Sequence, residues 1–276
     1  MQSLYRRIAG LDVHRMLLVL TVLIEQDEGT VTTHQRSFGG FTHDLSALVA
    51  WLVELGVHLV VMESTGIYWK SVYTALEKAG IAAHVVNARH VKNVPGRKTD
   101  VADSEWLAQL GRFGLVKPSF IPPQDLRELR LVSRYRQKLA QTLAAEKNRL
   151  HKMLDDAGIK LGAVVADING VSARAMIEGL IAGTPREQLP ELAKGTLRKK
   201  RDTLGQALTG DLSPRHRLVL QQIESHIRFL ETELATLETS LIDAMAPYAT
   251  SWQLLQTRPG IEQSAAAMIL GEIRTD

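Results

Sequence analysis

The chain has 276 residues with a formal net charge of +3, and its 45% hydrophobic content is enough for one large domain or two ordinary ones. Because it contains no cysteine, disulfides, zinc–thiolate sites and cysteine nucleophiles are excluded, and the composition suits a reducing cytosol. No signal pattern opens the chain, and the apolar run at 16–24 is too short to span a bilayer. We therefore expect a cytoplasmic protein with no membrane partner.

The first part of the chain alternates strand and helix patterns. In chain order we expect strands at 5–13, 16–24 and 30–38, a helix at 42–55, a strand at 58–63, a helix at 67–79, a strand at 82–88 and a helix from about 99 toward 113. The first three strands have short links and should be antiparallel. This is the ribonuclease H-like order, in which the first strand is central and pairs with the fourth. We expect this α/β domain to span 1–123, where Pro122 and Pro123 end it.

Four carboxylates stand out in this domain. Asp12 and Glu63 interrupt or end apolar strands, where a buried carboxylate is costly unless something pairs with it. Asp100 and Asp103 are three residues apart, so they share one face of a helix. In the expected topology Asp12 and Glu63 are neighbours.

Carboxylates brought together in this way repel one another, by roughly 1–4 kcal/mol per pair at about 4 Å. Divalent cations with a preference for oxygen ligands, Mg²⁺ or Mn²⁺, relieve that repulsion. We therefore predict a metal-dependent catalytic site that cuts phosphodiester bonds, held by Asp12, Glu63, Asp100 and Asp103. Lys98, beside the aspartate pair, either offsets phosphate charge or is simply solvated. If the four carboxylates were only structural, each should pair with Arg or Lys.

A long amphipathic helix is expected at 125–157, within a helical region at 124–246. Residues 124–160 carry nine basic and five acidic residues, a net charge of +4. The side opposite the apolar stripe is basic, which predicts nucleic-acid contact, with a solvated face as the alternative. Its basic residues are Arg127, Arg130, Arg134, Lys138, Arg149 and Lys152.

A second long helix shows an apolar repeat from Leu220 to Leu241 at spacings of three and four. This is a coiled-coil seam, which either pairs with the helix at 125–157 or joins chains into a homo-oligomer. Between the two helices, the run Arg198–Arg201 either touches phosphate or is solvated.

The last residues, 247–276, hold Pro259-Gly260-Ile261 before a helix of small residues. This is the form of a helix-hairpin-helix element, whose helix N-terminus offers backbone N–H groups to an anion. No second helix follows before Asp276, so we expect the start of a helical carboxy-terminal domain that is incomplete.

Several motifs, in this order and spacing, resemble transposases of the IS110 family: Gly10–His14, Met62–Trp69, Asn87–Arg89, Lys98–Asp103, the Arg-rich helix and Pro259–Ile261. The resemblance implies a RuvC-like domain with an Asp, Glu, Asp, Asp set, which falls on Asp12, Glu63, Asp100 and Asp103. It implies a nucleoid-associated recombinase whose partners are DNA and a structured guide RNA. It also implies a serine nucleophile beyond Asp276. Ser264 is expected to cap a helix instead, and Glu262 stands where the family usually has glycine, which would weaken a phosphate contact.

Three other functions remain open. A stand-alone RuvC-like Holliday-junction nuclease would share the carboxylates without needing the Pro-Gly-Ile element. An inactive transposase remnant would keep the basic faces but not the chemistry. An actin-like phosphotransferase would need glycine-rich phosphate loops, and none is visible in the sequence.

Overall fold

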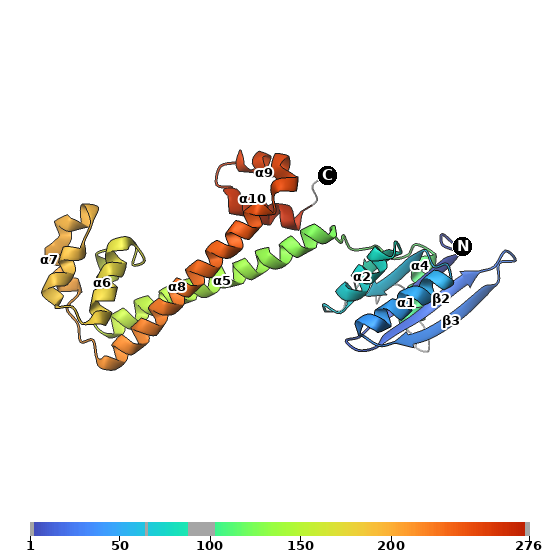
Figure 1. Cartoon of the computed structure of the whole chain (residues 1–276), viewed down its shortest axis with the longest axis horizontal. Helices are drawn as coiled ribbons and strands as arrows, with labels where there is room; N and C mark the ends of the chain where they lie inside the picture. Colours follow the sequence, from blue (N-terminus) through green and yellow to red (C-terminus); the bar gives the residue numbers. More distant parts are fainter. Residues whose placement is uncertain (1–2, 64–65, 88–102, 274–276) are drawn as a thin grey trace. The chain divides into compact units, whose positions relative to one another are not determined.

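A computed structural model describes residues 3–63, 66–87 and 103–273. The chain forms two compact units, Met1–Ile121 and Pro122–Asp276 (Figure 1). None of the helices in these described ranges combines the length and apolarity that crossing a bilayer would need.

Unit 1 is built on one mixed sheet. Within the described residues its strands are β1 (Arg7–Val13), β2 (Leu18–Glu25), β3 (Val31–Phe38), β4 (Leu59–Glu63) and β5 (Ala82–Val86). Their order is β3-β2-β1-β4-β5, so β1 is central. It pairs antiparallel with β2 and parallel with β4, and β5 extends the parallel half. The expected order, and the pairing of the first and fourth strands, are confirmed.

Helices cover both faces of this sheet. One face packs against α1 (Thr42–Glu54) and α2 (Trp69–Lys78), through residues such as Leu11, Leu48 and Leu76. The other face packs against α4 (Asp103–Arg112), through residues such as Ile8 and Leu107. Alternate residues of β1 therefore enter two different cores, as strand geometry requires. The mixed α/β class predicted for this unit is confirmed.

Unit 2 is helical in its described part. Its two long helices, α5 (Gln124–Asp156) and α8 (Pro214–Asp243), pack against each other. Leu220, Ile223 and Ile227 of α8 are buried in a core shared with Leu150 and Leu154 of α5. The predicted seam therefore packs against this chain's own helix. Self-association through α8, and with it a coiled coil between chains, stays a prediction.

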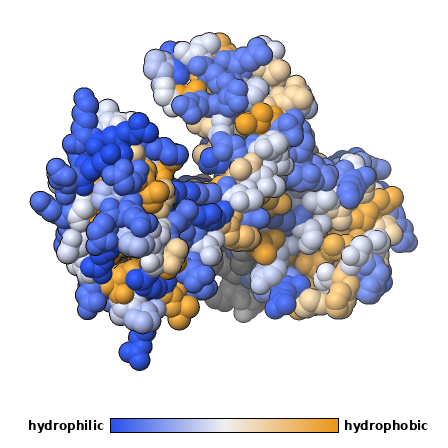
Figure 2. All heavy atoms as spheres, turned by 60° about the vertical axis from the view of Figure 1, so that its left-hand side comes forward, coloured by the Kyte–Doolittle hydropathy of each residue, from blue (hydrophilic) through white to orange (hydrophobic). Residues whose placement is uncertain are grey.

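The segment between the two long helices forms a head at one end of unit 2. Its elements are η1 (Leu161–Ala163), α6 (Val171–Ala182), η2 (Arg186–Leu192), η3 (Gly195–Lys200) and α7 (Arg201–Ala207). Figure 2 shows one face of the whole chain, which is mostly hydrophilic and carries its hydrophobic residues in separate patches. In unit 2, the apolar residues with exposed side chains include Leu218 and Phe229 of α8.

The other end of unit 2 holds η4 (Ala246–Tyr248), α9 (Ala249–Gln256) and α10 (Gln263–Glu272). The turn at Pro259-Gly260-Ile261 lies between α9 and α10, with Gly260 at a φ of +83°. A helix that was not expected from the sequence, α9, precedes the turn, and the incomplete carboxy-terminal domain stays a prediction. Helix α9 is only eight residues long and has no fully buried residue, so it leaves little apolar pattern in the sequence.

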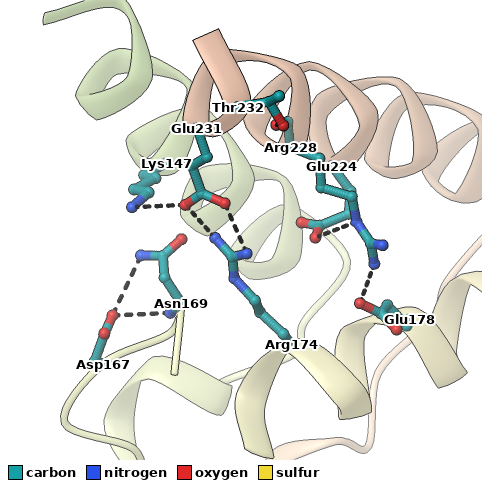
Figure 3. Close-up of polar contacts among 9 residues, drawn as sticks. All are labelled: Lys147, Asp167, Asn169, Arg174, Glu178, Glu224, Arg228, Glu231 and Thr232. Atoms are coloured by element: carbon teal, nitrogen blue, oxygen red, sulfur yellow. Dashed lines mark hydrogen bonds and ion pairs between the residues drawn. The ribbon is translucent and has the colours of Figure 1, made fainter. Parts of the chain in front are cut away.

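Ion pairs fix the head against the long helices (Figure 3). Arg174 of α6 donates two hydrogen bonds to the carboxylate of Glu231 on α8, one of them 2.8 Å long. Lys147 of α5 lies 3.3 Å from the same carboxylate. Next to this group, Arg228 of α8 joins Glu178 of α6 and Glu224 of its own helix. Charges from three helices therefore meet at one place.

The Arg174 guanidinium holds the pKa of Glu231 below its ordinary value of 4.5. A carboxylate with a lowered folded-state pKa stabilises the fold above its unfolded pKa, and that stability is lost as pH falls through the folded value. We predict that Glu231→Gln lowers the free energy of unfolding by about 1–2 kcal/mol at pH 7, measured by urea denaturation. The difference from wild type should shrink below pH about 4.5.

Glu233→Gln is the matched control, since Glu233 lies on the same helix and has no ion pair in the described part of the chain. It should change stability little at either pH. An equal loss in both variants would show that the ion-pair group does not stabilise the head.

Candidate metal site on the sheet

Two of the predicted carboxylates lie side by side at the carboxyl ends of β1 and β4. The parallel register pairs Leu11 with Met62, so Asp12 and Glu63 are the next residues on neighbouring strands. Asp12 is four residues after Ile8, and Glu63 is two residues after Val61, so each lies on the same face of its strand as that apolar residue. Ile8 and Val61 both belong to the core under α4. Asp12 and Glu63 therefore share the face of the sheet that α4 covers.

Helix α4 brings the third carboxylate to this face. Its first residue is Asp103, and the next residue, Ser104, lies directly over Gly10 of β1. A Cβ atom at Gly10 would be 1.9 Å from the Ser104 carbonyl oxygen and 2.4 Å from the Ala108 nitrogen. Only glycine allows this approach. Gly10 is two residues before Asp12 on the same face of β1, so Asp103 lies near the end of the strand that carries Asp12.

The other end of α4 is held by an ion pair and by a second close contact. Arg112 donates a 2.7 Å hydrogen bond to Glu25 of β2. A hydrogen bond from Ser3 and this contact with Arg112 lower the pKa of Glu25. A Cβ atom at Gly111 would lie 2.5 Å from Val61. Helix α4 thus runs back along β1, with its first turn toward the carboxylates and its last turn toward Ile8.

The environment of the carboxylates is open to solvent. The Asp12 side chain is 29% exposed, and its Oδ2 lies 3.1 Å from Nε2 of His14. Asp103 is exposed, and Glu63 is partly exposed. Within the ranges described above, no three His, Asp or Glu side chains are arranged to hold a metal ion together. The predicted residues Asp100 and Lys98 lie outside the described residues.

The donors that these elements bring together have the chemistry that Mg²⁺ or Mn²⁺ requires. Carboxylate oxygens are hard ligands, and both cations keep some water in their coordination shell, which a partly exposed strand end permits. Asp12, Glu63 and Asp103 lie on one face of one sheet and are of the ligand type that these cations bind, but the described side chains alone do not converge on an ion.

The basic side predicted for α5, here called the basic stripe, contains arginines with partners inside unit 2 and lysines that are exposed. Several of its arginines make contacts within unit 2. Arg130 donates to the carbonyl oxygens of Gly271 and Glu272, and Arg134 makes two hydrogen bonds, of 2.9 and 3.0 Å, to the Glu272 carboxylate. This pairing raises the pKa of Arg134 and lowers that of Glu272.

The remaining residues of the basic stripe are two arginines with partners inside unit 2 and two exposed lysines. Arg149 pairs with Glu146, and Arg127 donates to the carbonyl oxygen of Pro122 at 2.8 Å. Lys138 and Lys152 are exposed. The arginines near α10 thus also hold the end of unit 2 together, and the two lysines are the members of the stripe most available to a polyanion.

Sequence reasoning missed the residues that place the carboxylates. Gly10 was part of a motif, but its contact with α4 depends on a residue far along the chain. The pairing of Arg112 with Glu25 spans 87 positions and leaves no local pattern.

Comparison with known proteins identifies the family. The profile of a transposase family, DEDD_Tnp_IS110, matches residues 9–159, which is more than half of the chain. The chain belongs to this IS110 transposase family. No curated protein matches it.

Two solved structures of RuvC from Thermus thermophilus are similar to part of the chain. One is 16% identical, with a TM-score of 0.31, and the match covers 41% of this chain and 99% of that one. The other, RuvC in complex with a Holliday junction substrate, is 14% identical at the same TM-score of 0.31, over 42% of this chain and 100% of that one.

The approach of α4 to Gly10 gives a direct prediction. Gly10→Ala should lower the free energy of unfolding by about 1–3 kcal/mol, because the added methyl group meets backbone atoms that cannot rotate away. Chemical denaturation of the purified chain measures this difference.

Gly205→Ala in α7 is the matched control, since a Cβ atom there meets nothing nearer than 3.8 Å. Helix propensity predicts that it is neutral or stabilising by about 0.5–1 kcal/mol. If Gly10→Ala behaved like this control, the close packing of α4 on β1 would be wrong.

Proposed function

We propose that unit 1 is the metal-dependent DNA-cleaving domain of a transposase. The observation that carries this proposal is the placement of Asp12 and Glu63 on adjacent parallel strands, with α4 bringing Asp103 to the same face. Membership of a transposase family makes DNA the expected substrate.

Asp12, Glu63 and Asp103, with Asp100, would hold one or two Mg²⁺ ions. When bound, such ions supply positive charge that stabilises the attacking and leaving oxygens of a phosphodiester. The carboxylates orient that charge at the open end of β1 and β4. His14, 3.1 Å from Asp12, can hold the Asp12 carboxylate in one orientation.

Unit 2 supplies a nucleic-acid surface in this proposal. Exposed Lys138 and Lys152 on α5 contact phosphates, while Arg130 and Arg134 also brace α10. Each phosphate contact adds to the salt dependence of binding, because it releases counterions from the DNA. Use of a guide RNA, of a serine nucleophile outside residues 1–276, and of a homo-oligomer belongs to the same proposal and rests on the family.

Two sets of substitutions separate chemistry from binding. Asp12→Asn should abolish Mg²⁺-dependent cleavage of a branched DNA and leave its affinity for that DNA nearly unchanged. The double variant Lys138→Ala/Lys152→Ala should bind the DNA more weakly, with a salt dependence reduced by about two phosphate contacts. Cleavage is read on gels, and affinity by fluorescence anisotropy at several salt concentrations.

Asp27→Asn is the control for loss of one exposed carboxylate in unit 1, because Asp27 lies in the turn between β2 and β3 and contacts Arg6. It should cleave like wild type. Full cleavage by Asp12→Asn would refute the metal site, and cleavage that needs no divalent ion would refute the proposed chemistry. An unchanged salt dependence in the lysine variant would contradict the proposal that α5 contacts the DNA.

A further inference from the structure

Two hydroxyl groups meet in the core of unit 1, below the carboxylates. Thr21 of β2 and Ser104 of α4 are each 1% exposed, and their side-chain oxygens are 2.8 Å apart. They are the only buried polar side chains in the described part of this unit. Hydroxyl groups placed in an apolar core need a hydrogen bond to offset the loss of water.

This contact joins the two elements that determine where Asp103 lies. Thr21 is the β2 partner of Gly10, so the hydroxyl pair sits beside the place where α4 approaches β1 most closely. Ser104 directly follows Asp103. A hydrogen bond at Ser104 therefore fixes the first turn of α4 one residue away from the carboxylate.

Between its first turn and Arg112, which pairs with Glu25, α4 contacts the sheet through apolar residues. Its sheet-facing residues include Ala108 and Gly111, which are small and have no directional contacts. Dispersion contacts of this kind are weak individually and tolerate small shifts, whereas a hydrogen bond restricts both distance and angle. A displacement of α4 by one residue would move Asp103 by about 1.5 Å along the helix and about 100° around it.

The hydroxyl pair also connects to the sheet edge. Nε2 of Gln35 on β3 donates to the Thr21 oxygen at 3.3 Å. Three elements, β3, β2 and α4, are thus linked by side-chain hydrogen bonds on the face that carries the carboxylates.

We propose that the Thr21–Ser104 hydrogen bond is a positioning contact for the metal site, which keeps the first turn of α4 and Asp103 in place beside the end of β1. This inference rests on the proposed function. Both residues are buried, so they act through the position of α4 and not by direct contact with a ligand.

The test uses the full chain and separates position from stability. Thr21→Val leaves the buried Ser104 hydroxyl without its Thr21 partner, and Ser104→Ala leaves the Thr21 hydroxyl with Gln35 alone, so each variant should unfold at lower denaturant concentration. In the double variant both hydroxyls are gone and the volumes are nearly kept, so stability should return toward wild type. Mg²⁺ affinity, measured by calorimetry, should nevertheless stay about tenfold weaker in the double variant.

Two further variants complete the set. Thr21→Ser keeps the hydroxyl and should keep wild-type affinity for Mg²⁺. Ser133→Ala removes another buried hydroxyl, from α5 in unit 2, and should not affect Mg²⁺ affinity. Without metal, amide hydrogen exchange in the first turn of α4 should be faster in the double variant than in wild type.

The outcomes distinguish this inference from the function on which it rests. If wild type shows no Mg²⁺ binding, the proposed metal site and this inference both fail. If wild type binds Mg²⁺ and the double variant binds it equally well with unchanged amide exchange, only the positioning role is overturned, and the hydroxyl pair contributes to stability alone.

Discussion

The close approach of α4 to β1 at Gly10 is the constraint on which the organisation of unit 1 depends. The absence of a side chain lets the backbone of Ser104 and Ala108 rest directly on the central strand. Because β1 is central and parallel to β4, the same approach that buries Leu107 among Ile8 and Val61 also carries Asp103 toward the strand end that holds Asp12. The same contact between α4 and β1 therefore packs the core and places the carboxylates.

Unit 2 is held together by helix packing and ion pairs. The apolar seam of its long helices continues into the core of the head, and a second, smaller core joins their other ends to the region of α9 and α10. Ion pairs add orientation to these cores, since Glu231 accepts from Arg174 in a partly buried pair and Glu272 accepts from Arg134 in an exposed one. The Arg174–Glu231 pair in particular needs both partners, since removal of one leaves a charge that is only partly solvated.

Much of this architecture could be predicted from the sequence because it is local. Alternation gives the strands, helical periodicity gives α1, α5 and α8, and the order of elements gives a central first strand. Asp12 and Glu63 could be identified as neighbours because topology alone pairs their strands. Asp100 falls outside the described residues, so its predicted place in the set stays a prediction.

The rest depends on contacts between distant positions. A helical projection places Arg134 on a basic face, but it cannot show that Glu272, 138 residues away, meets it. The same limit hides the bond between Thr21 and Ser104, which are 83 residues apart. Helix α9 went unrecognised because its contacts come from neighbouring elements and its own pattern is weak. Local patterns indicate which face a residue occupies, and only the folded chain shows what lies opposite.

The central claim is that the carboxyl ends of β1 and β4, with the first turn of α4, form a divalent metal site. Anomalous X-ray scattering from crystals of the chain soaked in Mn²⁺ tests it most directly. We predict a manganese peak bonded to carboxylate oxygens of both Asp12 and Glu63 and lost in Asp12→Asn crystals. A peak at other residues, or none beside these two carboxylates at saturating Mn²⁺, would contradict the account.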